Sequence, residues 1–513
     1  MFSIGAEILI TPYRTCIRPG CPKQGHSNTD RKSYAGYLYT LRRGVLPVRI
    51  LTLYCRGCNT TYRPNYHVHR AEQPIASRNY NAALVPQYLE VTEHTYVERE
   101  LVVLFRNQMA FSHTSAEAAA RIYNLSIRKL DEDKFLRSEM VWHGFFLHAL
   151  LQHHTDHSST LILPHQGANE RRLDSALHER NLLMVGTGQK YWAHACEGCS
   201  RVVKDPDGAM YQIDACVMDG VTLGHPRCNV SDCTNPLQSS RNRFCKTHQQ
   251  QEYVCAIEGC ISQAAISFRT CDDPSHHNIE LRRREQGQAI FRLKARLARA
   301  TTGDTGNDLG LASNHNNKSH SASGASRVKT SLSRKWTHNE QLMVRCCGVI
   351  VSRATFYNAE SPSNAADFVA ATFPSHLPRG RPSYLFYDNS CSLLRHLRAS
   401  ADTRLSGIAL VVDVFHAVNK HKDTDTFCQM HCNPAGFPDL YDQEEGWLYN
   451  SSAAEQTNIW FGGFQSITKD MSEIHYNFFL DEMIAIRNDF WVSELLTRGK
   501  KPHIVPYEEL VLA

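Results

Sequence analysis

The chain has 513 residues, of which 42% are apolar and 21% are charged. These proportions are typical of a soluble globular protein, and the length predicts about two to four domains rather than one compact module. The net charge of +5 is compatible with a polyanionic partner but does not require one. We find no apolar run long enough to cross a membrane and no secretory leader, so we expect an intracellular protein with no membrane contact.

The first segment, residues 1–70, contains four cysteines in two pairs. Cys16 and Cys21 precede the strand-like segment Val45–Tyr54, and Cys55 and Cys58 follow it. In a reducing compartment such pairs are better metal ligands than disulfide partners. The pattern is typical of a zinc ribbon with four thiolate ligands.

The next segment, residues 71–185, is expected to be mainly helical. Val97–Arg106 and Ala116–Tyr123 have helical periodicity. They predict either a helix-turn-helix that reads DNA, with Asn124 and Arg128 near the exposed end of the second helix, or a scaffolding hairpin.

The most specific motif is a tandem repeat of cysteine and histidine. Each half offers three thiolates and one imidazole, a set that closes a tetrahedral zinc site without leaving a position for water, so both sites should be structural. The predicted ligands are Cys228, Cys233, Cys245 and His248 for the first site, and Cys255, Cys260, Cys271 and His276 for the second. The sequence allows His277 in place of His276.

Two further groups of metal-ligand residues are less regular. Cys196 and Cys199 form a Cys-x2-Cys knuckle, for which His194, Cys216 and His225 are the nearest partners. A later group mixes ligand types at irregular spacing and is equally compatible with a metal site and with a polar loop: it comprises His416, His421, Cys428, His431 and Cys432. The chain is therefore expected to bind two to four zinc ions.

Basic charge gathers in Leu281–Ala300, where a helix with an Arg- and Lys-rich face is expected either to contact phosphate or to be solvated. Charge reversal at Arg282, Arg283 and Arg284 would separate these two readings. Residues 301–334 have almost no bulky apolar side chains, so they predict a flexible linker.

Several apolar, strand-like runs end in an acid. Tyr211–Asp219 and Tyr384–Asp388 are two of them, and Ile408–Asp413 is a third. Glu455 lies near the start of an expected helix that Ser451 or Ser452 can cap. Carboxylates in such positions can hold Mg²⁺ or Mn²⁺ for phosphodiester chemistry, although Asp also ends strands as a turn residue.

These residues resemble the KDZ (Kyakuja–Dileera–Zisupton) transposase group. The blocks CIRPGC…LTLYCRGCNTTYRPNYHV and ACEGC…RCNVSDC…RFCKTH…CAIEGC…TCDDPSHH are similar to two cysteine-cluster domains that accompany these transposases. The later runs FYDNSCSLLRHL, VDVFHAVNKH, HCNPAGFPDL and SSAAEQTNIWFGGFQSI resemble the transposase core.

The resemblance implies a mixed α/β fold with a ribonuclease H-like core and an acid triad of Asp219, Asp388 and Glu455. Asp214 and Asp413 are the reserve acids. The implied domains are a zinc-ribbon-like cluster (1–70), a helical region that can include a helix-turn-helix (71–185), the first part of the core (186–220), the tandem zinc insertion with its basic helix (221–300), a disordered linker (301–335) and the rest of the core (336–513).

The resemblance also implies a nuclear DNA transposase that cleaves phosphodiesters and transfers strands with Mg²⁺ or Mn²⁺. DNA is the implied partner, with homodimer formation on DNA as an option. The third acid motif departs from the family pattern, because Ser451–Ala454 precede a lone Glu455 where the family has an acidic pair around a glycine. The alternative is a catalytically inactive, transposon-derived zinc protein that binds DNA or chromatin.

Overall fold

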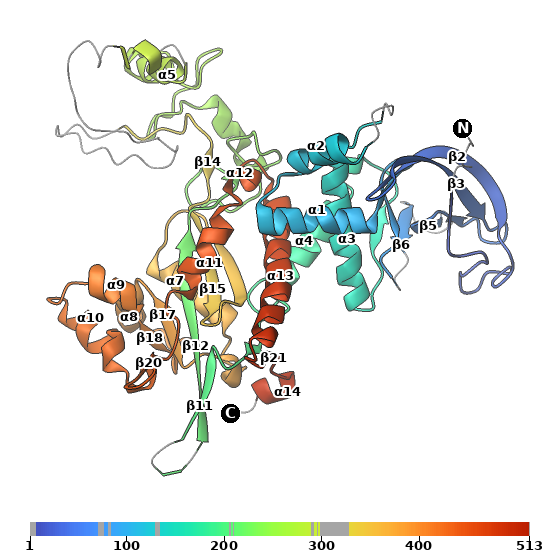
Figure 1. Ribbon diagram of the computed structural model, residues 1–513. Coiled ribbons are helices and arrows are strands. Elements are labelled where there is room, and N and C mark those ends of the chain that lie inside the picture. Colours follow the sequence, from blue (N-terminus) through green and yellow to red (C-terminus); the bar gives the residue numbers. More distant parts are fainter. Residues whose placement is uncertain are drawn as a thin grey trace. The chain divides into compact units, whose positions relative to one another are not determined.

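The computed structural model describes residues 7–69, 76–80, 84–128, 134–204, 207–208, 210–288, 292–294, 296–297 and 328–511. The chain divides into two compact units (Figure 1). The larger unit contains residues 1–224 and 338–513, and the smaller unit contains residues 225–337. In the described ranges, no helix combines the length and the apolar character that a membrane span requires.

The N-terminal part of the larger unit is a nine-stranded sheet. Its strand order is β7-β8-β2-β3-β4-β5-β6-β9, and β1 pairs in parallel with β3. The strands are β1 (Glu7–Ile10), β2 (Thr29–Thr40), β3 (Gly44–Tyr54), β4 (Thr61–Tyr62), β5 (Tyr66–His69), β6 (Ser77–Tyr80), β7 (Tyr88–Thr92), β8 (Thr95–Glu98) and β9 (Ile162–Pro164).

Strand β3 confirms the predicted strand at Val45–Tyr54. Val48 and Ile50 are buried while Arg49 between them is exposed, which is the two-residue period of a strand with one face in the core. The predicted boundary at residue 70 does not coincide with a boundary of this sheet, because β6 to β9 continue it within the segment expected to be helical. These strands are short, and β6 and β8 also pair with strands that are distant in sequence, β9 and β2, so local periodicity does not indicate the sheet.

Four helices pack beside this sheet. They are α1 (Arg99–Ser112), α2 (Ala116–Ser126), α3 (Ser138–Asp156) and α4 (Asp174–Leu183). Ser115 caps α2 by accepting a hydrogen bond from the backbone N–H of Ala118 at 3.2 Å. The predicted helical pair is present as α1 and α2, and both helices pack on α3. α3 packs on β7, and α1 packs on β8.

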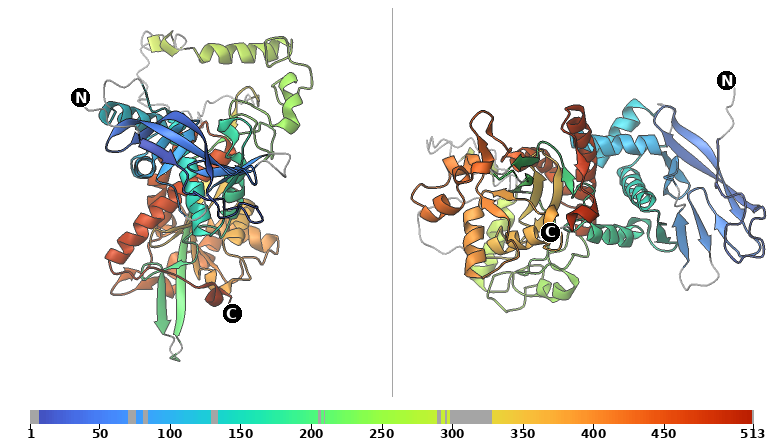
Figure 2. Two further views of the ribbon diagram at one scale, coloured as in Figure 1. Left: turned by 90° about the vertical axis from the view of Figure 1, so that its right-hand side faces the viewer. Right: turned by 90° about the horizontal axis from the view of Figure 1, so that it is seen from below.

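The second sheet has the order β16-β15-β12-β17-β18, with β11 paired to β12. The strands are β11 (Ser200–Lys204), β12 (Met210–Val221), β15 (Asn339–Arg345), β16 (Ile350–Phe356), β17 (Tyr384–Tyr387) and β18 (Ala409–Val411). β12, β15 and β16 are antiparallel neighbours, whereas β17 and β18 run parallel to β12. β11 and β12 form a hairpin that extends beyond the other strands (Figure 2).

Helices cover both faces of this sheet. α7 (Pro362–Thr372) and α8 (Ser390–Ala399) share a core with Met218 and Leu385. α11 (Ala453–Gly462) and α13 (Glu473–Thr497) share a core with Val217 and Phe386. These residues are next to Met218 and Leu385 on the same strands, so their side chains point to the other face of the sheet. Figure 1 shows α11 and α13 near β12 and β15.

Shorter elements complete the larger unit. They are β10 (His194–Ala195), β19 (Tyr441–Asp442), β20 (Gly446–Trp447), β21 (His503–Ile504), α9 (Val414–Asn419), α10 (Thr426–His431), α12 (Gln465–Thr468), α14 (Tyr507–Leu510) and the 3₁₀ helices Asn169–Arg171, Pro378–Gly380, Pro434–Gly436 and Pro438–Leu440.

A buried ion-pair network holds α13 against the sheet. Arg353 on β16 donates to Asp481 at 2.8 Å and to Glu340 at 3.0 Å, and all three side chains are less than a tenth exposed. Burial raises the pKa of Glu340, and the opposing charge of Arg353 acts to lower it. The arginine thus compensates two carboxylates that would otherwise be buried without a counter-charge.

The smaller unit contains the tandem cysteine and histidine motif. Its regular elements are β13 (Pro226–Arg227), β14 (Lys335–Trp336), the 3₁₀ helix Lys246–Tyr253 and α5 (Pro274–Gln286). Much of the predicted linker, residues 301–327, lies outside the described residues. Its final residues differ from the expectation, because Leu332 is buried and Ser331 N–H donates to the carbonyl of Ala256 at 2.7 Å.

The predicted helix at Leu281–Ala300 is wrong in its bounds. The helix begins at Pro274, with Asp273 as its cap, and ends at Gln286. Of the residues after Gly287, the structure describes 288, 292–294 and 296–297, and the last two ranges are helical. The start at Asp273-Pro274 is a strong helix signal because proline fits the first turn, and the sequence reasoning overlooked it.

Candidate functional site

Asp219 and Asp388 lie at adjacent strand ends of the second sheet. The parallel register of β12 and β17 pairs Met218 with Tyr387. The next residues are the two acids, Asp219 within β12 and Asp388 directly after β17. Both acids follow residues of the face covered by α11, because Val217 and Phe386 two positions earlier lie in that core. The structure therefore brings the first two predicted acids to one edge and one face of the sheet.

Glu455 lies in the first turn of α11 on that same face. Ser452 is the N-cap residue, although its side chain makes no capping hydrogen bond. Glu455 Oε1 is 3.6 Å from His416 Nδ1, and the glutamate side chain is 39% exposed. α11 packs on β12, and Asn458 one turn later donates from Nδ2 to Asp219 Oδ2 at 2.8 Å.

The electrostatics of this edge reflect the closeness of the acids. Burial raises the pKa of Asp219 to about 6, and the negative charges of Asp388 and Glu455 raise it as well. Hydrogen bonds from Gly220 and Asn458 act in the opposite direction. Burial, followed by the charge of Glu360, also raises the pKa of Asp388. Proximity of this kind is not expected from strand-ending or capping acids that are far apart in the sequence.

Two buried oxygens at this edge have no hydrogen-bond partner among the described residues. Asp388 Oδ1 is buried and accepts no hydrogen bond from the described part of the chain. Asn458 Oδ1 beside Asp219 is in the same situation. Buried oxygens without donors are costly unless water or a cation satisfies them. These oxygen atoms suit a hard divalent cation, which prefers carboxylate and amide oxygens.

The two reserve acids have other roles. Asp413 caps α9 by accepting hydrogen bonds from the backbone N–H groups of Phe415 and His416, and its second oxygen binds His416 Nδ1. Asp214 lies nearer the start of β12, opposite Ser200 of β11. Asp214 thus lies away from the acid edge. Asp413 lies at that edge, because the parallel register pairs Phe386 with Val411, and Asp388 and Asp413 each follow two residues later.

The N-terminal cysteines converge as predicted. Sγ atoms of Cys16, Cys21, Cys55 and Cys58 all lie within 4.8 Å of one another, and all four residues are buried. Cys16 to Cys58 measures 3.6 Å and Cys21 to Cys55 measures 3.7 Å. Sulfurs bound to one tetrahedral zinc are separated by about 3.8 Å, because each Zn–S bond is about 2.3 Å. The four thiols can therefore bind one zinc ion.

Both halves of the tandem repeat also converge. The ligand atoms within each half lie within 4.8 Å of one another: Cys228, Cys233, Cys245 and His248 in the first half, and Cys255, Cys260, Cys271 and His276 in the second. His276 Nδ1 lies 3.3 Å from Cys271 Sγ, whereas the ring of His277 packs on Phe268. His276 is thus the ligand candidate, and both quartets can bind zinc.

The knuckle of Cys196 and Cys199 is completed by two residues, of which sequence reasoning named only one. His194 Nε2 and Cys347 Sγ are 3.3 Å apart, and both join the knuckle within 4.8 Å. Cys347 lies in the turn between β15 and β16, distant in sequence from Cys199. Cys216 is buried in the sheet core, and His225 belongs to the smaller unit. The only local signal for Cys347 is a cysteine pair next to Gly348.

The last group of ligand residues separates into two sets. His421 and Cys428 converge with Cys391, which sequence reasoning did not name. His416 joins the acids instead, and His431 Nε2 lies 3.1 Å from Arg398. Both sets lie close to Asp388, because His421 Nε2 is 2.9 Å from the Asp388 carbonyl oxygen and the charge of His416 acts to lower the pKa of Asp388.

Four of the five residues named from sequence for DNA contact have internal partners. Arg283 donates to Ser333 at 2.6 Å, and Arg284 donates to Glu280 at 2.6 Å. Asn124 donates to the carbonyl of Leu136 at 2.8 Å and accepts from its N–H at 2.9 Å. Arg128 lies over the ring of Phe135. These contacts favour a structural part for Asn124, Arg283 and Arg284.

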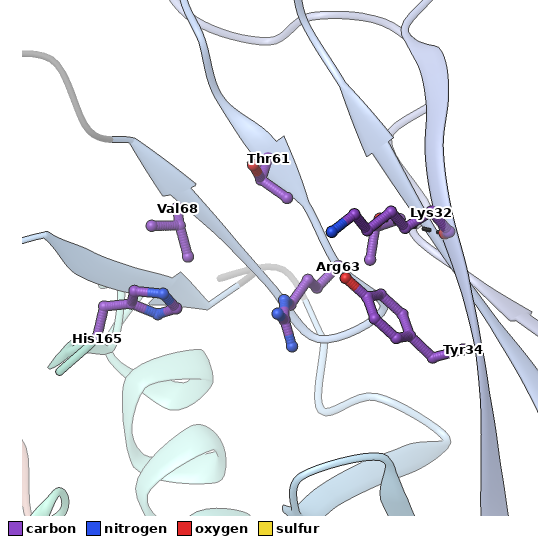
Figure 3. A pocket seen from close by; sticks show the side chains of 7 residues that line it. Lys32, Tyr34, Thr61, Arg63, Val68 and His165 are labelled. Carbon is purple, nitrogen blue, oxygen red and sulfur yellow. Dashed lines mark hydrogen bonds between the residues drawn. The ribbon is translucent and has the colours of Figure 1, made fainter. Parts of the chain in front are cut away.

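A polar pocket of about 160 Å³ opens in the N-terminal sheet (Figure 3). Lys32, Tyr34 and Arg63 extend polar ends into the same space, and His165 lies across from them. Arg63 is 3.9 Å from the carboxylate of Glu90, so part of its charge is balanced. Lys32 is exposed and supplies a further cation there.

Comparison with known proteins gives two family matches. Residues 4–127 match the CxC5-like cysteine cluster associated with KDZ transposases, and residues 217–282 match the CxC6-like cysteine cluster associated with KDZ transposases. No curated protein matches the chain, and no solved structure matches it. The first match contains the N-terminal quartet, and the second contains both tandem quartets. The chain thus carries two cysteine clusters of the kinds associated with KDZ transposases, which supports its resemblance to that group.

Proposed function

We propose that this chain is a KDZ-type DNA transposase that cleaves phosphodiesters and transfers strands with an acid triad of Asp219, Asp388 and Glu455. The observation that carries the proposal is the adjacent position of Asp219 and Asp388 on parallel strands, with Glu455 entering from α11 on the same face. The sheet supports a ribonuclease H-like core, since three antiparallel strands continue into two strands parallel to the central one.

The acids are suited to hold divalent cations. When bound, two such ions activate a water molecule or a 3′-hydroxyl group and stabilise the leaving oxygen. Asp219 is oriented by Gly220 N–H and by Asn458, while the buried Oδ1 of Asp388 accepts no hydrogen bond from the residues that the structure describes. Mg²⁺ or Mn²⁺ is therefore the proposed catalytic metal, separate from structural zinc in the cysteine quartets.

The remaining assignments follow from this activity. DNA is the proposed partner and the nucleus the proposed location, with a homodimer on DNA as one form of the complex. The cysteine quartets are proposed to hold structural zinc, because closed sets of sulfur and nitrogen donors leave no position for water. The cations at the pocket of Figure 3 are of the kind that contact a phosphate backbone.

A second candidate is a zinc protein that binds DNA without cleaving it. Glu455 favours this candidate, because its side chain is 39% exposed and its carboxylate oxygen lies 3.6 Å from His416 Nδ1. The test is strand cleavage of duplexes that carry the terminal repeats flanking the coding sequence. Cleavage that requires Mg²⁺ or Mn²⁺ and is lost in Glu455→Gln supports the transposase. Tight DNA binding without cleavage by the wild-type chain supports the second candidate.

A further inference from the structure

Three metal-ligand side chains meet beside Asp388, outside the regions of the two family matches. Cys391 lies on α8, Cys428 lies on α10, and His421 lies between α9 and α10. Their ligand atoms are all within 4.8 Å of one another, and both cysteines are buried. His421 Nδ1 is 3.2 Å from Cys428 Sγ and 3.9 Å from Cys391 Sγ.

These separations fit a common metal ion. Sulfur and nitrogen ligands of one tetrahedral zinc lie about 3.5 Å apart, given bonds of about 2.3 and 2.0–2.1 Å. The corresponding contacts in the other clusters are similar, for example 3.6 Å between Cys228 and His248. Two thiols with an imidazole favour zinc over magnesium or calcium, which prefer oxygen ligands.

The second nitrogen of His421 determines its tautomer. Nε2 lies 2.9 Å from the backbone carbonyl oxygen of Asp388. A carbonyl oxygen can only accept a hydrogen bond, so Nε2 carries the proton and the lone pair of Nδ1 faces the two thiols. Metal-binding histidines commonly donate their other N–H in this way, which fixes the orientation of the ring.

We propose that Cys391, His421 and Cys428 bind a further zinc ion, and that this ion fixes the backbone of Asp388 through His421. Cys432, which is buried beside Cys391 and Cys428, or a water molecule fills the fourth position. The zinc ties α8 and α10 to the residue that ends β17. The positioning of Asp388 for catalysis rests on the proposed function, whereas the zinc site itself does not.

The first test uses the full wild-type chain and alkylation read by peptide mass spectrometry. Removal of zinc by a chelator should make Cys391 and Cys428 reactive together with Cys255 and Cys271. Cys216 is the internal control, because it is buried in the sheet core apart from every cluster and should stay protected. Protection of Cys391 and Cys428 at chelator concentrations that expose the tandem quartets would overturn the site.

The second test compares zinc content between variants. Cys428→Ser should lose one zinc ion per chain, and Cys216→Ser should lose none. Cys428→His, which keeps a zinc donor, should restore the ion. If Cys428→Ser does not fold, the alkylation test on the wild-type chain still shows whether Cys391 and Cys428 bind zinc.

The link to Asp388 has its own readout. Cys428→Ser should raise the Mn²⁺ concentration needed for half-maximal cleavage several-fold, and Cys428→His should reverse this change. An unchanged Mn²⁺ requirement in a zinc-deficient variant would overturn the link. A wild-type chain that holds the zinc but cleaves no DNA would contradict the proposed function and leave the zinc site standing.

Discussion

Asn458 Nδ2 lies 2.8 Å from Asp219 Oδ2, and this hydrogen bond joins the helix that carries Glu455 to the strand that carries the first acid. Because the bond favours the charged form of Asp219, it makes this carboxylate available to a cation near neutral pH. The geometry of the acid edge therefore depends on a side chain that does not itself need to bind metal.

Replacement of Asn458 by Leu should weaken divalent metal binding. A hydrogen bond to a charged group contributes about 1.5–3 kcal/mol, so we expect roughly tenfold weaker Mn²⁺ affinity by calorimetry. Asn450→Leu is the control, because Asn450 is exposed and its side chain, among the described residues, bonds Gln456 and the Ser452 backbone near the start of α11. Equal affinities of the two variants would show that the Asn458 contact has no part in metal binding.

Asp219 should make the metal-free chain less stable as the pH rises. Burial raises its pKa from 3.8 to about 6, so the folded chain binds an extra proton between these values. The stabilising contribution of this proton is full below the lower value and is lost as the pH rises through the higher one. At about pH 8, Asp219→Asn should therefore unfold at a higher denaturant concentration than the wild type. Its free energy of unfolding should be greater by about 1–3 kcal/mol.

At about pH 5 the difference in free energy of unfolding between the wild type and Asp219→Asn should shrink, because most wild-type Asp219 is then protonated. The difference between proteins is the measured quantity, since protonation of cysteine ligands affects both equally. If Asp219→Asn were less stable than the wild type at both pH values, burial of the Asp219 carboxylate would not be destabilising as we predict.

Cys347→Ala should remove one zinc ion per chain, because this thiol completes the set with His194, Cys196 and Cys199. The matched control is the preceding residue, since Cys346→Ala removes a buried thiol that belongs to the apolar core and to no ligand group in the described residues. Native mass spectrometry of both variants gives the count directly. If only the Cys346 variant lost zinc, Cys346 rather than Cys347 would be the ligand, and the prediction would be wrong.

Arg353→Met should be strongly destabilising. The change leaves Asp481 and Glu340 buried without their counter-charge, which costs about 3–5 kcal/mol in comparable cases. Arg404→Met offers the contrast, because Arg404 is 51% exposed in its pairs with Asp402 and Asp367, and exposed pairs contribute about 0–1 kcal/mol. Urea unfolding should separate the two variants. Similar midpoints would mean that the α13 network is not compensating buried charge.

The sequence was most informative where ligands are close together in the chain. Each tandem quartet spans a short segment, so its spacing indicated the ligands that the structure brings together, except that it allowed His277 in place of His276. Asp219 and Asp388 could also be predicted from the sequence, because each ends an apolar run and such acids gather at one sheet edge when the strands are parallel. The helix at Leu281–Ala300 was wrong because basic composition was weighed above the Asp273-Pro274 start signal.

Cys347 and Cys391 could not be identified from spacing. Cys347 meets Cys199 only because β12 and β15 pair across the insertion of residues 225–337, and local periodicity does not encode that pairing. Cys391 meets Cys428 because α8 and α10 pack together in the tertiary structure. The continuation of the N-terminal sheet through β9 has the same origin, since its short strands gain stability from their neighbours rather than from local preference.

The most direct test of the acid site is Mn²⁺-dependent cleavage of terminal-repeat DNA by Asp388→Asn compared with Asp214→Asn. Asp214 lies on the same strand as Asp219 but away from the acid edge, so its variant controls for loss of a carboxylate from the sheet. We predict that Asp388→Asn abolishes cleavage while it retains zinc and DNA binding, and that Asp214→Asn cleaves like the wild type. Full metal-dependent cleavage by Asp388→Asn would contradict the account.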